Sequence, residues 1–266
     1  MSIVARHILV LTFFSLSLSS SVHARECNKI VISADSDYAP LHWYDGKKLT
    51  GASIEIASTA LTALHVPFEV RYVGPFQRVL QEAKSGEIDM IASLKETPER
   101  HEYLLFSSVA LFSNPIAVFV AKDKPFPYSN WQDLIGKKGG ITLGYQFGGG
   151  FDEFLQANLK IETAQKTYMN FEKLELGQIN YLVTGYYSGI VYLQQTGQEN
   201  NFSVLKPYIS ETANLIGISK LSPCVKYMAS LDKELDRMQK NGTLTAILKK
   251  HIALIPTLGK KRYQDE

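Results

Sequence analysis

A chain of 266 residues with 28 basic and 26 acidic side chains has a net charge of +2, and 45% of its residues are hydrophobic. This near-neutral balance, with lysine and arginine scattered along the chain, excludes the basic patch through which proteins bind nucleic acid, so we expect no nucleic-acid partner. The length and the hydrophobic content suffice for one large domain or two small ones, each with a real core.

The first 24 residues have the pattern of a signal peptide. Arg6 supplies a positive start, residues 8–18 form a largely apolar run, and small residues precede the expected cleavage after Ala24. The apolar run is too short to span a bilayer, and nothing later approaches about 18 consecutive apolar residues. Because Cys27 follows Arg25-Glu26 rather than small residues, we expect no lipid anchor. We therefore predict export to the periplasm as a soluble protein of 242 residues, 24 fewer than the full chain.

Strands and helices alternate through the next part of the chain. Apolar residues at helical spacing, such as Ile54, Ala57 and Leu61, indicate a helix, and short β-rich runs bounded by loops indicate strands. This order predicts parallel strands joined by crossover helices. The expected elements are a strand at 29–33, a loop at 35–40, a helix at 51–64, a strand at 68–73, a helix at 75–83, a strand at 88–92 and a helical turn at 97–103.

A second α/β unit begins after a β-rich run at 116–121, where residues 131–137 start the cycle again. Its expected strands are 140–143, 167–169, 181–183 and 203–205, and its expected helices are 151–158, 171–176 and 188–196. The chain then continues with a strand at 213–219, an amphipathic helix at 228–240 stopped by Asn241-Gly242, and a last helix at 244–251.

The two cysteines, Cys27 and Cys224, lie almost at opposite ends of the mature sequence. An even pair in an exported chain favours a disulfide, and two separate buried thiols are the alternative. A disulfide would place both ends of the chain in one lobe. We therefore predict lobe one at 25–117 and 213–257, lobe two at 118–212, and a flexible tail at 258–266. The two chain crossings between the lobes would form a hinge over a cleft.

Residues 86–100 indicate an anion-binding loop. A short apolar strand there ends in a polar segment, Ser93 to Thr97, which supplies hydroxyls and backbone N–H groups. Arg100 follows with a planar fork of donors that matches a carboxylate bidentately. The alternative is an arginine that forms a salt bridge on a surface helix.

Five blocks in order carry a resemblance to a known family. They are Asp35-x-x-Tyr38-x-Pro40-Leu41, Gly51-x-x-Ile54-Glu55-Ile56, Gly86-x-Ile88-Asp89 through Thr97-x-x-Arg100, Leu134-x-Gly136-Lys137, and Asn241-Gly242-Thr243. With these blocks the chain resembles the bacterial periplasmic solute-binding proteins of the polar amino-acid class, family 3, which deliver ligands to ABC importers. The resemblance implies the type II periplasmic-binding-protein fold, in which two α/β lobes close on a ligand across a hinged cleft.

The resemblance also implies roles for individual residues. The arginine matching Arg100 clamps the ligand's α-carboxylate, the aromatic residue matching Tyr38 covers its side chain, and a lobe-two loop matching 144–148 adds backbone N–H groups. Asp35 and Trp43 join this set because they lie on the loop after the first strand, where binding residues concentrate. The full candidate set is Asp35, Tyr38, Trp43, Ala92, Ser93, Lys95, Arg100, Gly144, Tyr145, Gln146 and Gly185.

Two positions depart from the family pattern. Gly185 stands where amino-acid receptors commonly carry the aspartate that binds the ligand's ammonium, and Lys95 stands where serine or threonine is usual. A cation about 4 Å from a ligand ammonium would cost roughly 4 kcal/mol at an effective dielectric of 20. A plain α-amino acid would then need Asp35, Asp37 or Glu96 as a substitute. The alternative is that Lys95 points to solvent.

The function that we expect is capture of a small carboxylate-bearing ligand, an amino acid or a related organic acid, and its delivery to the membrane permease of an ABC importer. We expect a monomer without enzymatic activity or cofactor. We also expect no metal site, because the six histidines show no metal-ligand spacing. Two alternatives stay open. One is an exported ligand sensor without transport, and the other is a dehydratase-like enzyme of the same fold that uses Lys95 and Glu96 beside Arg100.

Overall fold

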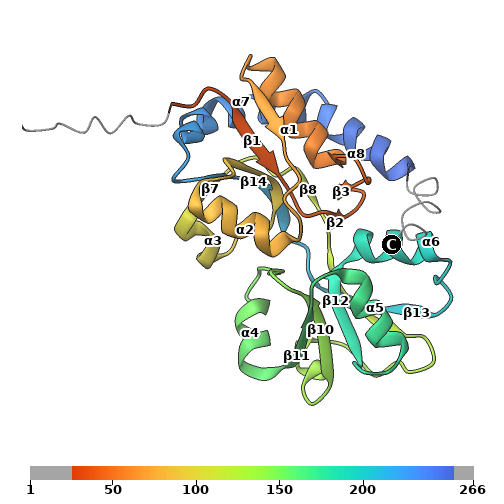
Figure 1. The fold of residues 1–266 in the computed structure, drawn as a ribbon. Helices are drawn as coiled ribbons and strands as arrows, with labels where there is room; N and C mark the ends of the chain where they lie inside the picture. Colours follow the sequence, from red (N-terminus) through yellow and green to blue (C-terminus); the bar gives the residue numbers. More distant parts are fainter. Residues whose placement is uncertain (1–25, 255–266) are drawn as a thin grey trace, which may run out of the picture.

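The computed structural model describes residues 26–254, which form two α/β lobes (Figure 1). The N-terminal elements, in orange, share the upper lobe with the blue C-terminal elements, and the green and teal middle of the chain forms the lower lobe. The expected signal peptide at 1–24 and the expected tail at 258–266 lie outside the described residues.

The first sheet has the strand order β5-β1-β6-β14-β7, and β8 pairs with β14. Strand β1 runs parallel to β5 and β6, while β14 is antiparallel to β6, β7 and β8. Their bounds are β1 Ile30–Ser33, β5 Phe68–Val70, β6 Met90–Leu94, β7 Leu104–Phe106, β8 Phe112–Ser113 and β14 Ala213–Ser219.

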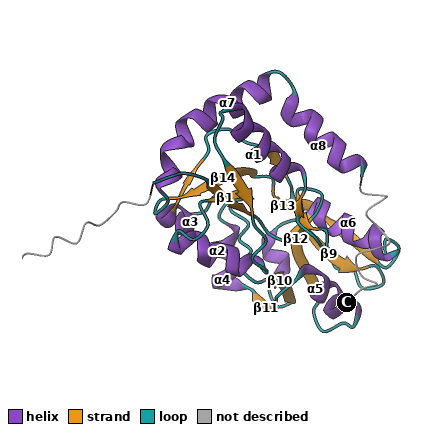
Figure 2. Cartoon of the chain, turned by 45° about the horizontal axis from the view of Figure 1, so that its top comes forward, coloured by secondary structure: helices purple, strands orange, loops and turns teal. Residues whose placement is uncertain are grey.

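Helices from both ends of the chain cover this sheet, as Figure 2 shows for α1, α7 and α8. The apolar side chains of these three helices form one buried core with β1, β6 and β14. A small sheet, β2-β3-β4, follows β1 and leads into α1. The bounds are α1 Ala52–Ala63, α2 Phe76–Ser85, α3 Pro98–Tyr103, η2 Pro223–Tyr227, α7 Met228–Lys240, α8 Thr243–Ala253, β2 Asp37–Tyr38, β3 His42–Tyr44 and β4 Leu49–Thr50.

The second sheet has the strand order β11-β10-β12-β9-β13. Strand β10 is parallel to β11 and β12, and β9 is antiparallel to β12 and β13. The bounds are β9 Ile116–Ala121, η1 Trp131–Leu134, β10 Lys138–Thr142, α4 Phe151–Asn158, β11 Lys160–Ala164, α5 Thr167–Glu175, β12 Tyr181–Gly185, α6 Tyr186–Thr196 and β13 Phe202–Ser210.

Two of the expectations for secondary structure are wrong. Residues 167–169 open α5, and the neighbouring strand is β11, which the sequence did not indicate because it is an edge strand with exposed or half-buried residues, Lys160 and Glu162 among them. The sheets are also mixed rather than parallel, because β9, β13 and β14 run against their neighbours. These three strands lie directly before or after the two segments in which the chain passes from one sheet to the other.

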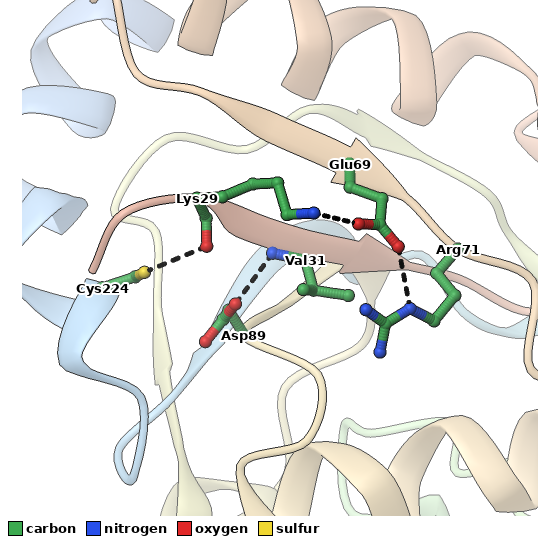
Figure 3. A network of polar contacts seen from close by, with 6 residues as sticks. All are labelled: Lys29, Val31, Glu69, Arg71, Asp89 and Cys224. Carbon is green, nitrogen blue, oxygen red and sulfur yellow. Dashed lines mark hydrogen bonds and ion pairs between the residues drawn. The ribbon is translucent and has the colours of Figure 1, made fainter. Parts of the chain in front are cut away.

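The C-terminal part of the chain is fixed to β1 by polar contacts and by a disulfide. Asp89 accepts hydrogen bonds from Val31 N (2.8 Å) and from Ser222 Oγ (2.6 Å), and its carbonyl accepts one from Ser219 N (2.8 Å). Figure 3 shows Asp89 beside β1, with Cys224 next to Lys29, just before the strand begins. Cys224 is bonded to Cys27, with Cα atoms 5.0 Å apart, so the predicted disulfide is confirmed.

The chain passes twice between the sheets. Asn114 lies between β8 of the first sheet and β9 of the second, and Thr212 lies between β13 and β14. We therefore propose that the lobes divide at these two residues, close to the boundaries at 117 and 213 expected from the sequence. Because β9 begins at Ile116, this division assigns residues 116 and 117 to lobe two.

The disulfide gives a test of how the two ends of lobe one are joined. It closes a loop with a sequence separation of 197 residues, so its loss should enlarge the unfolded ensemble. For the variant C27S/C224S we expect a free energy of unfolding lower by about 2–5 kcal/mol, measured by urea denaturation. A reducing agent should lower the wild-type midpoint and leave that of the double variant unchanged. Superimposable wild-type and variant curves would contradict this role.

Candidate functional site

A small cavity lies between the lobes, and its volume is about 40 Å³. Lobe one contributes the segment after β1, the end of β6, helix α3 and β14, and lobe two contributes the β10–α4 loop and the end of β12. The lining residues are Asp35, Tyr38, His42, Phe76, Ser93, Leu94, Lys95, Arg100, Ile116, Tyr145, Gln146, Phe147, Gly185 and Asn214. We call this the first cavity.

Arg100 lies at its boundary because of how α3 begins. Thr97 is the N-cap, its side chain accepts from Arg100 N (3.3 Å), and Pro98 starts the helix, which turns Arg100 inward. Only 2% of Arg100 is exposed. This burial excludes the alternative of a surface salt bridge, and it lowers the pKa of the guanidinium.

The Arg100 guanidinium bonds to carbonyl oxygens from both lobes. Nη1 donates to Lys95 O (2.7 Å) and Nη2 donates across the cleft to Gly144 O (3.0 Å), while the buried Nε has no partner. The guanidinium also lies 5.6 Å from the centre of the Phe76 ring. Within residues 26–254, no carboxylate forms a salt bridge with it. A buried cation held only by neutral acceptors is suited to receive an anion.

Further hydrogen bonds cross the cleft, so the lobes are closed. Tyr145 Oη donates to Asp35 Oδ2 (2.6 Å), and Thr167 N donates to Asp37 Oδ2 (3.2 Å). Gln146 accepts from Thr97 Oγ1 (2.9 Å) and donates to Glu99 Oε2 (2.5 Å). Side chains of the protein itself therefore occupy much of the interface between the lobes.

The loop after β10 uses its backbone N–H groups within lobe two. Tyr145 N donates to Thr142 O (3.0 Å), Phe147 N donates to Asp152 Oδ1 (2.9 Å) and Gly148 N donates to Asp152 Oδ2 (2.8 Å). The resemblance predicts N–H groups of residues 144–148 at the ligand carboxylate, and these three N–H groups bond within lobe two. Toward lobe one the loop presents the Gly144 carbonyl and the side chains of Tyr145 and Gln146.

Tyr38 fills the space beside Gly185. Its ring stacks on His42 with centroids 5.2 Å apart, and the Tyr145 ring lies nearly perpendicular to it with centroids 5.9 Å apart. A Cβ atom on Gly185 would lie 2.5 Å from both Tyr38 Oη and Asn114 Nδ2. In this closed arrangement the site therefore has no room for an aspartate at position 185. Burial lowers the pKa of His42 to about 4, so this ring is neutral at physiological pH.

Lys95 joins the two chain crossings and does not point to solvent. It is 5% exposed, and its Nζ donates to Asn114 O (3.2 Å) and to Thr212 O. Burial lowers its pKa to about 8. Lys95 thus holds the hinge with its side chain while its carbonyl holds Arg100.

A second cavity adjoins the first at Arg100, and its volume is about 360 Å³. It lies between α2 and α3 of lobe one and the β10–α4 region of lobe two, and it shares Arg100, Tyr145 and Gln146 with the first cavity. Its lining is Gln77, Leu80, Gln81, Lys84, Glu99, Arg100, Tyr103, Ile141, Gly144, Tyr145, Gln146, Asp152, Leu155 and Gln156.

Most of the candidate residues come together at these cavities, and two do not. The first cavity holds Asp35, Tyr38, Ser93, Lys95, Arg100, Tyr145, Gln146 and Gly185, and Gly144 lines the second. Ala92 is buried within β6 and lines neither cavity. Trp43 packs away from the site, with its ring centre 5.9 Å from that of His251. Its position on β3 turns it toward a small apolar cluster with Ala39 and Val191.

The structure adds residues that sequence analysis did not select. His42 pairs with Tyr38 between β2 and β3. Its position on the same loop as Tyr38 and Trp43 could have indicated a place at the site. Asn214 donates to Ser93 Oγ (3.1 Å) from the start of β14. Phe76 and Phe147 also line the first cavity. The sequence alone does not distinguish them from aromatic residues of the core, because their place at the cavity depends on how their segments pack.

Comparison with known proteins gives a family match and a partial relative. A family model described as bacterial extracellular solute-binding proteins, family 3, matches residues 30–253. The arginine-binding extracellular protein ArtP of Bacillus subtilis (strain 168) is 27% identical over 137 residues, covering 50% of this chain and 52% of ArtP. The match thus spans about half the length of this curated relative.

Solved structures share the two-lobe fold. The substrate-binding protein AbpA of an amino acid ABC transporter from Streptococcus pneumoniae Canada MDR_19A, bound to L-arginine, has a TM-score of 0.72 at 20% identity, over 86% of this chain and 96% of that chain. A histidine kinase sensor domain with similarity to periplasmic binding proteins has a TM-score of 0.72 at 19% identity, over 84% of this chain and 95% of that chain. Within residues 26–254, no helix is both long enough and apolar enough to cross a membrane.

The buried Lys95 gives a pH-dependent prediction. Its pKa falls from an ordinary 10.5 to about 8, so between these values the native state binds fewer protons than the unfolded state, and stability rises with pH. Between about pH 7.5 and 9.5 we expect the free energy of unfolding of the wild type to rise by about 2 kcal/mol relative to Lys95→Met, measured by urea denaturation. Lys47→Met, at an exposed lysine, is the matched control and should follow the wild type. Parallel pH profiles for wild type and Lys95→Met would show that Lys95 is not buried as a cation.

Proposed function

Because the chain belongs to the bacterial extracellular solute-binding proteins, family 3, we propose that it captures a small ligand with a carboxylate in the periplasm and delivers it to the permease of an ABC importer. The ligand is an amino acid or a related organic acid. The protein acts as a monomer, and each lobe contributes one wall of the site.

The observation that carries this proposal is the buried guanidinium of Arg100 between the lobes. It is the donor group best suited to a carboxylate in the first cavity, because its planar fork can give two parallel hydrogen bonds. Its present acceptors are carbonyl oxygens at 2.7 and 3.0 Å, and its Nε has none. A carboxylate that replaces Gly144 O on Nη2 would exchange a neutral acceptor for a charged one, and charge-assisted bonds are roughly twice as strong.

In this proposal the permease recognises the form of the protein in which the two lobes are closed on the ligand. A ligand shifts the balance between open and closed forms only through a higher affinity for the closed form. Arg100 meets this requirement because both lobes line the cavities around it, so a carboxylate on Arg100 contacts lobe two only when the lobes meet. Tyr145 and Gln146 add bonds from lobe two to Asp35, Thr97 and Glu99 that likewise exist only after closure.

The relatives support the ligand class. ArtP is named as an arginine-binding extracellular protein, and AbpA was solved with L-arginine, an amino acid with an α-carboxylate. The position of the described site between two lobes supports a ligand carrier that closes over its cargo.

Replacing Arg100 tests the proposal. In Arg100→Met the ligand carboxylate loses its charged partner, and we expect affinity to fall by at least about 30-fold, since truncating one member of a buried charged pair costs about 2–5 kcal/mol. The measurement is ligand-induced thermal stabilisation, followed by calorimetric titration, with a panel of L-amino acids and organic acids.

Arg78→Met is the matched control, because Arg78 is an exposed arginine of α2 whose Nε bonds to Glu82 Oε1 (2.8 Å) on the same helix. It should bind like the wild type. If Arg100→Met retains full stabilisation by a compound that stabilises the wild type, the carboxylate site is not at Arg100 and the proposal fails.

A further inference from the structure

Of the two cavities described above, which both include Arg100 in their lining, one has the size of a ligand site. The first cavity has a volume of about 40 Å³ and the second about 360 Å³. Ligand pockets commonly measure about 300–1,000 Å³, and one water takes about 30 Å³ of liquid. A carboxylate on Arg100 would therefore lie at the boundary, and the rest of a sizeable ligand would extend into the second cavity.

The lining of the second cavity combines aliphatic side chains with amides. Leu80 of α2 and Leu155 of α4 contribute from opposite lobes, and the buried Ile141 of β10 adds a third aliphatic side chain. Four glutamines complete it, two from each lobe: Gln77, Gln81, Gln146 and Gln156. Aliphatic and amide groups suit a ligand segment that has both carbons and uncharged hydrogen-bonding groups.

The charged groups of the second cavity already have interactions. Asp152 accepts from two backbone N–H groups, Glu99 accepts from Gln146 Nε2, and the Lys84 ammonium lies 5.7 Å from the centre of the Tyr103 ring. Arg100 is reserved for the carboxylate. The two carboxylates and the one ammonium that remain thus each interact within the protein, and an uncharged tail would displace none of them.

The first cavity is poorly suited to an ammonium. Gly185 supplies no carboxylate, and the space beside it is taken by Tyr38 and Asn114. Both carboxylate oxygens of Asp35 accept hydrogen bonds, from Asp37 N (3.0 Å) and from Tyr145 Oη (2.6 Å). Lys95 adds a buried cation at the hinge. A ligand whose α-nitrogen is uncharged needs no carboxylate at position 185 and is not repelled by the Lys95 ammonium.

We propose that the ligand is an amino acid whose α-nitrogen is acylated, with its carboxylate on Arg100 and an amide-bearing tail in the second cavity. The chemical class is that of N-acyl amino acids and of short peptides without a charged amino group. This inference rests on the function proposed above, because it places the same carboxylate on the same arginine and adds what lies beyond it.

A paired ligand screen tests the inference. The probes are the twenty L-amino acids and their N-acetylglycyl derivatives, which add two amide groups and remove the ammonium. We expect the tightest ligand to be an N-acetylglycyl derivative, bound at least about tenfold more tightly than its parent amino acid in calorimetric titration, which is about 1.4 kcal/mol. A free amino acid as the tightest ligand, or no binding by any derivative, overturns the inference.

A variant at the rim locates the tail. Gln156 is exposed on α4, so Gln156→Trp should fold normally while narrowing the second cavity. We expect it to weaken the best N-acetylglycyl derivative by about tenfold and to leave the corresponding N-acetyl amino acid within about twofold. Gln239→Trp, at an exposed glutamine of α7, is the matched control and should change neither. Equal effects of Gln156→Trp on both ligands, or no effect on either, place the tail elsewhere.

The two proposals fail in different ways. A free amino acid that binds the wild type more tightly than any derivative, and loses affinity in Arg100→Met, leaves the carrier function intact and refutes the acylated ligand. Binding that survives in Arg100→Met refutes the carboxylate site itself.

Discussion

The structure is organised around a buried cation that forms no salt bridge with any carboxylate of residues 26–254. Arg100 is 2% exposed and bonds to the carbonyls of Lys95 and Gly144, one from each lobe. Removing a charge from water is expensive unless hydrogen bonds and an opposite charge compensate for it. The protein supplies the bonds and leaves the opposite charge to a ligand. Because the buried charge is incompletely compensated, binding of an anion to Arg100 is favourable, and the bound anion stabilises the closed lobes.

The hinge is coupled to that arginine through one residue. Lys95 holds Arg100 with its carbonyl and holds both chain crossings, at Asn114 and Thr212, with its ammonium. The crossings can act as a hinge because the C-terminal helices return to lobe one, where Asp89 and the disulfide of Cys27 with Cys224 fix them beside β1. Both chain crossings therefore connect lobe two to the same lobe, an arrangement that allows hinge closure.

Local patterns in the sequence were sufficient for most of the fold and for the position of Arg100. Helices 151–158 and 228–240 and the strand 213–219 are observed at the expected residues, and the disulfide joins the expected pair. What could not be predicted depends on contacts between distant segments. The ammonium of Lys95 bonds to a carbonyl 117 residues away, and Tyr38 fills the space left by Gly185 in the other lobe. Trp43 belongs to the apolar packing beside α8, which the loop sequence does not reveal.

The side-chain resonance of Arg100 tests the central claim most directly. Its ¹⁵Nε–¹Hε signal, assigned by its loss in Arg100→Lys, can be followed while the protein is titrated with the twenty L-amino acids and their N-acetyl derivatives. The buried Nε has no partner in the described structure, so a bidentate carboxylate should shift this signal saturably, with the same dissociation constant as calorimetry gives. A ligand that saturates the protein and leaves the Arg100 signal unchanged would contradict the claim that this arginine receives the anion.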